Sequence, residues 1–446
     1  MQPASPKLSK RGMEAFASRD FRRYQLARIA VILGAEAQAV AVAWQVYLIT
    51  HRAIDLGYTG LALFLPGFIF LLPAGHVADR FDRRQVILIC YSLQIFCSAS
   101  LLMLACANTR NVLQIYAVLF AVGTGRAFSA PAASALIPHL VPEEHFVNAV
   151  TWGGGIFQLA KITGPAVGGL LFTFPLSRLV ANTRLEGAGI VYAFTLATLV
   201  WFLALVSSLR VRPGRMEHRD FSLKVVLAGF QYLRRAPILL GSISLDLFVV
   251  LLGGAVALMP IFAHDILHQG PRGLGMLRAA PAVGAVLMSI VMARFPLQRK
   301  AGTWLFVSVI IFGVFTVVFG LSRNTWLSLG SLAIAGAADA ISVIIRGSMV
   351  QLATPAQMRG RVSAVNSLFI GASNELGEFE SGLTAQWWGA VRATVAGGIL
   401  ALVVSGLWAV LFPGLRKANE LTSESLREFL PADEVVSELW GESTSR

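Results

Sequence analysis

The chain has 446 residues, of which 56% are hydrophobic and 14% are charged, and its formal net charge is +13. Soluble globular proteins carry about 25% charged and 45–50% apolar residues, so this composition argues against a soluble enzyme, a disordered chain and a disulfide scaffold. The net positive charge fits the lysines and arginines of cytoplasmic loops, and nucleic-acid binding is not expected because no basic stripe with interleaved aromatics lies in a polar domain.

Apolar windows bounded by charge, proline and glycine predict twelve membrane-spanning helices, each of which needs roughly 20 apolar residues. The expected helices lie near residues 24–49, 56–78, 85–107, 112–137, 146–173, 187–209, 237–262, 273–294, 303–321, 325–347, 361–386 and 391–412. If the N-terminus is inside, the cytoplasmic segments contain 25 lysines and arginines and the opposite loops contain 7. This bias follows the positive-inside rule and predicts both termini in the cytoplasm, with the chain in a plasma membrane of the bacterial inner-membrane type.

The chain is predicted to divide into five parts. These are a cytoplasmic segment (1–23), a first six-helix bundle (24–209), a linker (210–236), a second six-helix bundle (237–412) and an acidic cytoplasmic tail (413–446). In the linker, apolar residues recur at helical spacing between basic ones, which predicts an amphipathic helix on the membrane surface.

The two predicted bundles echo each other at an offset near 213 residues. Corresponding positions are Gly123 and Gly336, Pro142 and Pro355, and the sequences GPAVGG at 164–169 and GEFESG at 377–382. A duplication of six plus six helices is the architecture of parallel-repeat transporters, whose binding sites lie near the membrane midplane between the halves. The repeat therefore predicts an all-helical membrane protein with a site between its bundles.

The join between the second and third predicted helices carries a cluster of small and charged residues: Gly75, Asp79, Arg80, Arg83 and Arg84. Glycine allows close helix packing, and the charges can pair with each other and with helix ends. The segment resembles the GxxxDRxGRR signature of the major facilitator superfamily, in which this cluster latches one conformation. Asp82 stands where that signature has its second glycine, a departure shared by one exporter branch.

A second motif lies in the fifth predicted helix, at Gly164, Pro165, Gly168 and Gly169. Glycines four apart form a face for tight helix contact, and a proline inside a helix introduces a kink. The motif resembles the GxxxGPxxGG antiporter motif of the same superfamily, with Ala160 in place of the first glycine. That resemblance implies an exporter that exchanges substrate for protons; the alternative is a packing motif without directional meaning.

Further stretches carry the resemblance to one exporter branch. They include SRDFRRYQLARI before the first helix, LIPHLVPEEHFVNAV, and MRGRVSAVNSLFIGASNELGEFESGLTA. They are similar to enterobactin exporters and macrolide efflux proteins of the transmembrane secretion effector type, and the resemblance covers residues 18–415. It implies the major facilitator fold, twelve helices in two six-helix bundles, and it implies transport without specifying the substrate.

Eight charged residues fall inside predicted helices: Glu36, Arg126, Lys161, Asp246, Arg278, Asp339, Glu375 and Glu378. The resemblance implies that the first, fourth, seventh and tenth helices, which carry four of these charges, line a central cavity. A charge at the bilayer centre costs roughly 2.5–3.5 kcal/mol, so eight that faced lipid would cost on the order of 20 kcal/mol. We therefore expect most of them to face a wet cavity or one another.

The acidic residues among them are candidates for proton coupling. Glu375 and Glu378 are three apart, so they share a helix face and oppose each other's ionisation. We expect this pair and Glu36 to take up and release protons, with structural ion pairs between helices as the alternative. Arg126 is expected to modulate Glu36 or to contact an anionic substrate, and Lys161 is expected to pair with an acid on the first or eighth helix.

For Asp246 and Asp339, substrate contact and pairing with an arginine both remain open, and Arg278 is a further cavity charge. Phe64, Phe128 and Phe157 are candidates for an apolar substrate pocket, although tryptophans and tyrosines near helix ends are more often interfacial anchors.

The leading function is a secondary active transporter: a proton-coupled exporter, or antiporter, of a lipophilic or amphiphilic small molecule such as a drug or siderophore, working by alternating access. A facilitator or importer without proton coupling is the first alternative, and a non-transporting membrane sensor is the second. We expect a monomer whose partners are the substrate, protons and the lipid bilayer, and we expect no cofactor.

An embedded enzyme is not expected, because the chain contains neither an HExxH pattern nor a GxxxxGK[ST] phosphate loop. His264 and His268 are four apart and adjoin Asp265, but a solvated outer loop is favoured there over a metal site.

Overall fold

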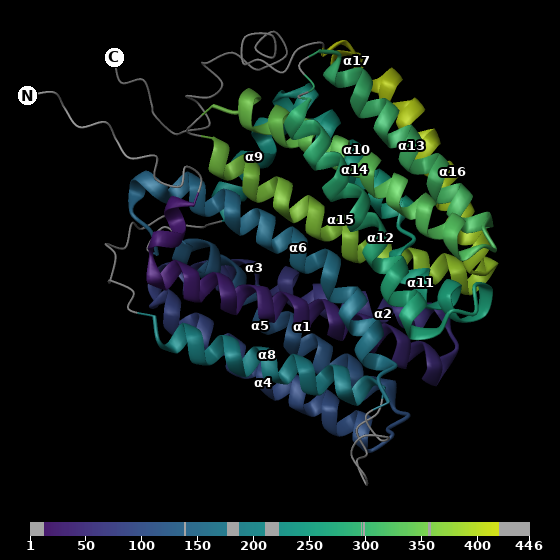
Figure 1. Cartoon of the computed structure of the whole chain (residues 1–446). Coiled ribbons are helices and arrows are strands. Elements are labelled where there is room, and N and C mark those ends of the chain that lie inside the picture. The colour runs from purple at the N-terminus through teal and green to yellow at the C-terminus, as the bar shows by residue number, and fades with distance from the viewer. Residues whose placement is uncertain are drawn as a thin grey trace, which may run out of the picture.

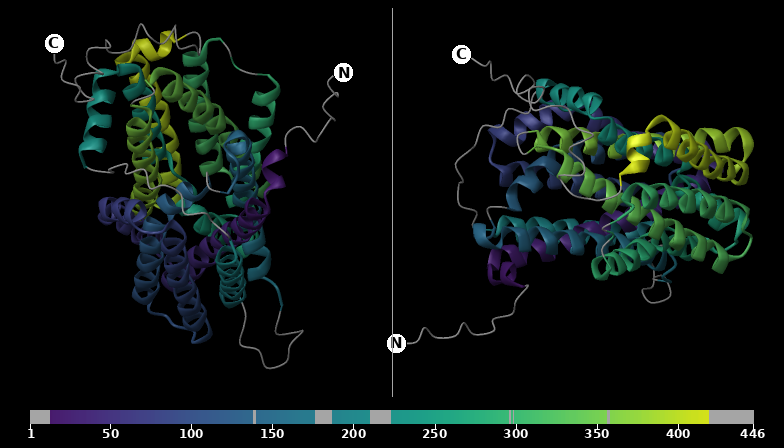
Figure 2. Two further views of the ribbon diagram at one scale, coloured as in Figure 1. Left: turned by 90° about the vertical axis from the view of Figure 1, so that its left-hand side faces the viewer. Right: turned by 90° about the horizontal axis from the view of Figure 1, so that it is seen from above.

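The computed structural model describes residues 13–137, 140–175, 187–209, 223–295, 297, 299–355 and 358–418. Within these ranges the regular structure is built of helices. Figure 1 shows long helices running side by side, and the left panel of Figure 2 shows the purple-to-blue helices of the first part of the chain below the green-to-yellow helices of the second part.

The first part of the chain is here called the N-terminal half. Its helices are α1 (Arg19–Thr50), α2 (Ala53–Ile69), α3 (Leu71–Arg80), α4 (Arg83–Cys106), α5 (Val112–Leu136), α6 (Phe146–Phe172) and α8 (Ala188–Ser207). Polar side chains define where several of them begin: Ser18 accepts a hydrogen bond from the Phe21 amide at 3.3 Å before α1, and Asn111 accepts one from the Leu113 amide at 3.0 Å before α5. Such N-caps satisfy amides that have no partner within the helix.

The second part is here called the C-terminal half. Its helices are α9 (Leu223–Arg235), α10 (Pro237–Gly253), α11 (Met259–Ile261), α12 (Gly270–Arg294), α13 (Ala301–Leu321), α14 (Thr325–Ala353), α15 (Arg359–Trp388), α16 (Ala390–Leu411) and α17 (Pro413–Lys417). A π-helical turn, Phe262–Ile266, follows α11.

Ten helices within the described residues are long and apolar enough to cross a membrane. They correspond to ten of the twelve predicted segments, and the all-helical membrane fold is confirmed. The other two segments correspond to α2 with α3, which are separated at Phe70 shortly after Pro66, and to the charged helix α15. A proline inside a helix removes a backbone hydrogen bond. That these two segments also cross the membrane stays a prediction.

Corresponding glycines make corresponding contacts in the two halves. A methyl group on Gly123 of α5 would lie 2.4 Å from the Leu63 carbonyl of α2, and one on Gly336 of α14 would lie 2.0 Å from the Pro281 carbonyl of α12. Both distances are too short for a side chain, so glycine lets the backbones of each pair meet. The sequence offset of 213 is thus matched by equivalent packing, α5 on α2 and α14 on α12.

The second pair of repeat glycines joins the halves. A methyl group on Gly169 of α6 would lie 3.2 Å from the Gly275 Cα of α12, and one on Gly382 of α15 would lie 3.0 Å from the Gly57 Cα of α2. The two halves therefore meet along two glycine-to-glycine crossings, α6 with α12 and α15 with α2.

The apolar cores show at which end of the molecule the two halves pack together and at which end they do not. One core contains only residues of the N-terminal half near the start of α1, including Phe21, and another contains only residues of the C-terminal half near the end of α16, including Leu415. A shared core lies where α1 ends: Trp44 and Leu56 there pack with residues such as Phe262 of the other half. We call the end with separate cores the terminal face and the end with the shared core the opposite face.

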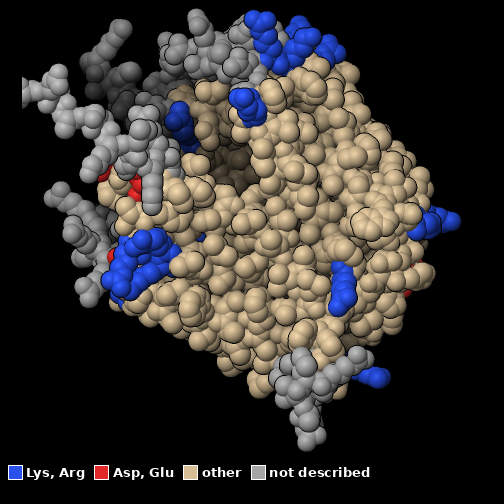
Figure 3. All heavy atoms as spheres, viewed as in Figure 1, with Lys and Arg blue, Asp and Glu red and all other residues tan. Residues whose placement is uncertain are grey.

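The molecule is hollowed near the terminal face. Figure 3 shows a hollow towards the upper left of the view, with Lys or Arg atoms near its rim, in the region where Figure 1 has α9 and the start of α15. The helix α9 covers part of this face because its Tyr232 hydroxyl donates to the Ala353 carbonyl at 3.2 Å and Gly229 lies against the Arg361 carbonyl. This predicted linker helix is therefore packed on α14 and α15 by one side, while Leu227 and Phe230 are exposed.

Three predicted segments extend beyond the described residues. These are the start of the N-terminal segment (1–12), most of the linker before α9 (210–222) and the acidic tail after 418.

Candidate functional site

Glu36 is held against the glycine motif of α6. A methyl group on Gly164 would lie 2.5 Å from the Glu36 Cβ, and one on Gly168 would lie 2.7 Å from the Cα of the next residue, Ala37. The motif GPAVGG therefore has two functions in packing: Gly164 and Gly168 receive α1, and Gly169 receives α12 of the other half. Glu36 is half-buried at this junction.

Glu375 and Glu378 lie on α15, opposite the N-terminal half. A methyl group on Gly60 of α2 would lie 2.8 Å from the Glu378 Oε2, so this carboxylate lies directly on α2. Both carboxylates are half-buried, and Glu378 interacts electrostatically with Glu36 across the interface between the halves. The three predicted proton-coupling residues thus belong to one cluster.

Three cations surround these carboxylates. Arg126 of α5 and Lys161 of α6 interact electrostatically with Glu375, and Arg278 of α12 interacts with Glu378. We call these six residues the interface cluster: Glu36, Arg126, Lys161, Arg278, Glu375 and Glu378. Each half contributes three of them, and Glu375 with its two cations and Glu378 with Glu36 interact across the interface, so movement of one half relative to the other changes these interaction energies.

The structure gives two of the predicted cations an acidic neighbour that was not expected. Lys161 was expected to pair with an acid on the first or eighth helix, which stays a prediction, and it interacts with Glu375 on α15. Arg126, expected to modulate Glu36, also interacts with Glu375. The reason is that α15 crosses the molecule against α2 and brings its carboxylates to the N-terminal half, a crossing that spacing along the sequence does not reveal.

Sequence reasoning missed Arg28, which lies beside the interface cluster. Its guanidinium Cζ is 5.8 Å from the centre of the Phe157 ring, and the Lys161 Nζ is 5.5 Å from the same ring. Arg28 also donates to the Gly153 carbonyl at 3.4 Å. Its signal in the sequence was a charge inside the first predicted helix, eight residues before Glu36 and hence about 12 Å along the helix.

Asp246 and Asp339 form a second group within the C-terminal half. Asp246 of α10 makes a 2.6 Å ion pair with Arg346 of α14, and Arg346 donates through Nε to Ser342 at 3.1 Å. Asp339 interacts electrostatically with both members of the pair. A cavity of about 10 Å³, enough for about one water molecule, is lined by Asp246, Asp339 and Ser342 among others.

Arg346 was also missed. It is buried, and it lies seven residues after Asp339 and four after Ser342, which places all three on one face of α14. That spacing is visible in the sequence, because Arg346 lies within the predicted helix at 325–347. Of the two roles left open for Asp246, the ion pair with an arginine is present.

The predicted latch residues lie at the terminal face, at the end of α3 and the start of α4. Asp82 caps α4 by accepting from the Arg84 and Gln85 amides at 2.7 and 3.3 Å, which explains a carboxylate at the position where the family signature has glycine. Arg84 donates to the Ser207 carbonyl of α8. Gly75 is buried, Arg80 is exposed, and the Asp79 side chain lies outside the described part.

The opposite face is closed by a polar network across the halves. The Tyr47 hydroxyl of α1 donates to Asp265, and the other Asp265 oxygen is 2.5 Å from the His264 Nδ1. The His264 ring lies 5.5 Å from Trp44 and 6.1 Å from His51. Three residues of α1 and its end therefore contact two residues of the π-helical turn, whose side chains, His264 and Asp265, stay 37% and 44% exposed, so the predicted solvated loop also makes a contact between the halves. No group of three potential metal ligands was found among the described residues.

The three aromatic residues that were predicted to line a substrate pocket have different neighbours in the structure. Phe157 belongs to the charged region, Phe128 packs against Phe70 at 5.7 Å at the edge of the N-terminal core, and Phe64 stacks on Phe68 at 6.4 Å. Only Phe157 contacts members of the interface cluster in the described interactions.

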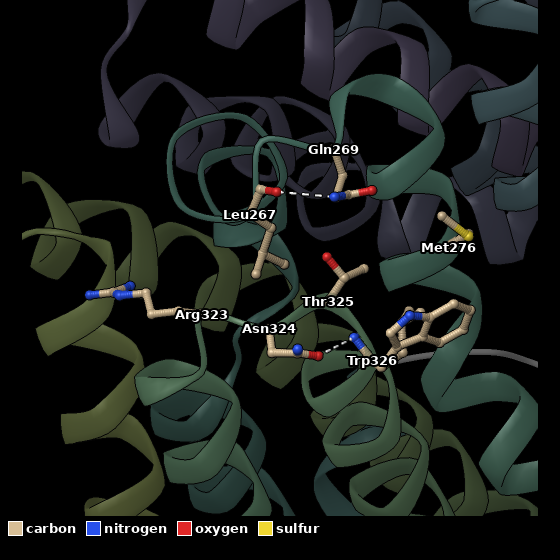
Figure 4. Close-up of a pocket in the computed structure, with 8 residues that line it drawn as sticks. Leu267, Gln269, Met276, Arg323, Asn324, Thr325 and Trp326 are labelled. Carbon is tan, nitrogen blue, oxygen red and sulfur yellow. Dashed lines mark hydrogen bonds between the residues drawn. The ribbon is translucent and has the colours of Figure 1, made fainter.

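A larger pocket of about 340 Å³ lies elsewhere, at the opposite face of the C-terminal half. Figure 4 shows Arg323, Asn324 and Trp326 around it, with the Asn324 side chain accepting from the Trp326 amide at 2.9 Å. It contains no member of the interface cluster. We therefore take the cluster between the halves, and not this pocket, as the candidate functional site.

Comparison with known proteins gives one matching family. Residues 11–443 match the family model described as transmembrane secretion effector. The chain is 26% identical over 407 residues to the enterobactin exporter EntS of Shigella boydii serotype 18, covering 90% of this chain and 93% of the relative. The enterobactin exporter EntS of Escherichia fergusonii matches with the same identity and coverage.

Solved structures share the fold. A bacterial homologue of the human lysosomal transporter Spinster, in an inward-facing and unoccupied conformation, superposes with a TM-score of 0.68 at 15% identity, covering 93% of this chain and 99% of that chain. A bacterial homologue of the iron transporter ferroportin, in an inward-facing state, has a TM-score of 0.62 at 16% identity, covering 88% and 98% of the two chains.

Proposed function

Because the chain belongs to the transmembrane secretion effector family of major facilitator transporters, we propose that it is a proton-coupled exporter of an amphiphilic small molecule. The family and the relatives are transporters, so the chain is an integral membrane transporter and not an enzyme. The observation that carries the proposal is the interface cluster, in which carboxylates and cations of both halves face each other inside a membrane protein.

The conformation supports alternating access. The halves share an apolar core at the opposite face, and their cores are separate at the terminal face. We propose that the terminal face is cytoplasmic, as the distribution of lysine and arginine predicts, so that this conformation receives substrate from the cytoplasm. Export then requires the Tyr47–Asp265 contact to open and the terminal face to close. The domain boundaries predicted from sequence mark the two moving halves.

We propose that Glu36, Glu375 and Glu378 carry the protons. Three carboxylates that interact across one interface cannot all keep their charge without cost in a site of low polarity. The neighbouring cations favour the ionised form, and separation of the halves takes Arg126 and Lys161 away from Glu375 and Glu378 away from Glu36. Rocking of the halves therefore changes which carboxylates hold a proton, and this change couples proton movement to the conformation.

The relatives support the class of cargo. The relatives are by name exporters of enterobactin, and they match 90% of this chain. We propose a drug- or siderophore-like amphiphile, because Phe157 offers an aromatic surface next to the charged cluster. The chain is proposed to work as a monomer.

Transport by inside-out membrane vesicles tests the proposal. A panel of amphiphiles is first screened by thermal shift, and each stabilising compound is then followed as it accumulates in the vesicles under an imposed gradient, acid inside. We expect accumulation that an uncoupler abolishes and that Glu36→Gln removes. The matched control is Glu380→Gln, a carboxylate on α15 outside the interface cluster, which should retain coupled uptake.

Two results would contradict the proposal. Uptake that is indifferent to the uncoupler would identify a facilitator, and coupled uptake that survives in Glu36→Gln would remove Glu36 from the mechanism. If no stabilising compound accumulates in any direction, the sensor alternative replaces transport.

A further inference from the structure

Three cations of the N-terminal half make no direct ion pair among the residues that the structure describes. Among the residues that the structure describes, no carboxylate oxygen lies within 4.0 Å of the charged nitrogens of Arg28, Arg126 or Lys161. All three lie in long apolar helices, α1, α5 and α6. A charge inside a membrane is costly, and Glu375, the carboxylate that interacts with Arg126 and Lys161 over a longer distance, carries a single negative charge against three positive ones, so the site favours a further anion.

These cations are close together. Arg28 and Lys161 both lie within 6 Å of the Phe157 ring, at 5.8 and 5.5 Å from its centre. Arg28 and Arg126 both interact electrostatically with Tyr91 of α4. Two cations lie beside one ring, and two are within electrostatic range of one phenol, so all three belong to one region, in which like charges repel unless an anion lies between them.

The space faces the interior and not the lipid. Arg126 and Lys161 are exposed, yet both interact with Glu375 of the other half, so their exposure is to the gap between the halves. Arg28 lies about 12 Å from Glu36 along α1, in the direction of the terminal face, which is the open one. A solute that enters from that face therefore reaches Arg28 before the carboxylates.

A buried side chain without partners marks the edge of the same space. Gln25 is 2% exposed, and neither its Nε2 nor its Oε1 has a hydrogen-bond partner. A methyl group on Gly153 would lie 3.3 Å from this Nε2 and 3.1 Å from the Arg28 Nη1, so the amide is next to the guanidinium. A buried amide left without partners is destabilising, and a ligand oxygen at this point would accept a hydrogen bond from its Nε2.

We propose that Arg28, Arg126, Lys161, Gln25 and Phe157 form a subsite for an organic anion, and that the transported amphiphile carries its negative group there. This inference rests on the proposed transport function and specifies its substrate class. The cations hold the anionic group, the Gln25 amide donates to it, and the Phe157 ring packs on its apolar or aromatic body. A phosphate of an anionic lipid shares this chemistry, so the test distinguishes the two sources.

The test measures binding and needs no transport. The protein is placed in phosphatidylcholine nanodiscs, and equilibrium binding of radiolabelled 2-naphthoate is compared with that of 2-naphthamide, which has the same ring and no charge. We expect the naphthoate to bind at least about tenfold more tightly, since a factor of ten is 1.4 kcal/mol and a hydrogen bond to a charged group contributes more than that.

Variants assign the site. Arg28→Gln and Lys161→Gln should each weaken naphthoate binding several-fold and leave naphthamide unchanged, and Lys161→Arg should keep the naphthoate affinity. Arg323→Gln, which removes a cation from the pocket of the opposite face, is the matched control and should have no effect. Equal affinities for the two probes would overturn the proposal, as would a loss of naphthoate binding in Arg323→Gln alone.

Further results distinguish a bound lipid from a soluble substrate, and failure of the subsite from failure of the proposed function. If phosphatidylglycerol in the nanodisc abolishes naphthoate binding, a lipid and not a soluble substrate occupies the cations, and the proposal fails. If naphthoate binds as expected but no panel compound shows proton-coupled uptake, the subsite stands and the proposed function fails. If coupled uptake is observed and Arg28→Gln and Lys161→Gln leave anion binding unchanged, the function stands and the subsite fails.

Discussion

The Asp246–Arg346 ion pair allows a quantitative prediction. Its side chains are 2.6 Å apart and only 10% and 7% exposed, and Arg346 also holds Ser342. Replacement of Arg346 by methionine leaves Asp246 buried without its cation and close to Asp339, a second carboxylate. Removal of one partner of a buried pair costs about 3–5 kcal/mol, because the remaining charge is uncompensated.

The double variant separates the ion pair from simple loss of packing. Asp246→Asn with Arg346→Met removes both charges, and replacement of a buried pair by uncharged groups is often nearly neutral. We therefore expect the double variant to be more stable than Arg346→Met alone, with a coupling of about 0.5–3 kcal/mol between the two positions.

The assay is reversible unfolding in mixed micelles with increasing denaturing detergent, read by circular dichroism. The control is Asp82→Ala, which removes the N-cap of α4 in the other half and should cost about 1 kcal/mol independently of either C-terminal change. Additive effects of Asp246→Asn and Arg346→Met, with the double variant the least stable of the three, would refute the reasoning.

Two further predictions concern the packing of α6 and the closure of the opposite face. Gly164→Ala should destabilise the protein by about 1–3 kcal/mol, because its methyl group would lie 2.5 Å from the Glu36 Cβ. Gly154→Ala on the same helix places its methyl group in open space and should be neutral or stabilising in the same unfolding assay. Equal effects of the two would contradict the packing. Tyr47→Phe removes the hydrogen bond to Asp265 and should shift the population towards a state open at the opposite face by about 1–3 kcal/mol, read as spin-label distances across that face. Tyr192→Phe, which loses a bond to Gln45 inside one half, should leave those distances unchanged, and a shift in both variants would refute the closure.

Periodicity and the repeat predicted most of the fold because each helix is specified locally. The apolar windows matched ten spans, and the offset of 213 matched the packing of Gly123 and Gly336. The breaks within helices were less predictable. The apolar window around Pro66 is continuous, so a single helix was predicted where the structure has α2 ending at Ile69 and α3 following Phe70.

The candidate site was predicted in its membership but not in its pairings. The membrane cost of charge identified Glu36, Glu375 and Glu378, yet the neighbours of Glu375 depend on how α15 crosses α2, which is a tertiary property. Arg28 and Arg346 were missed although both lie inside predicted helices, each near one end of its apolar window. The hydrogen bond between Tyr47 and Asp265 joins residues 218 positions apart, and no local sequence pattern predicts it.

Proton movement driven by substrate tests the central claim most directly. Proteoliposomes are loaded with a pH-sensitive dye and given a gradient of a transported amphiphile, without any imposed pH difference, and the internal pH is followed. The account predicts proton flux opposite to substrate flux, its loss in Glu36→Gln and in the double variant Glu375→Gln with Glu378→Gln, and its retention in Glu380→Gln. Substrate flux with no change in internal pH, or proton flux that persists without these three carboxylates, would contradict it.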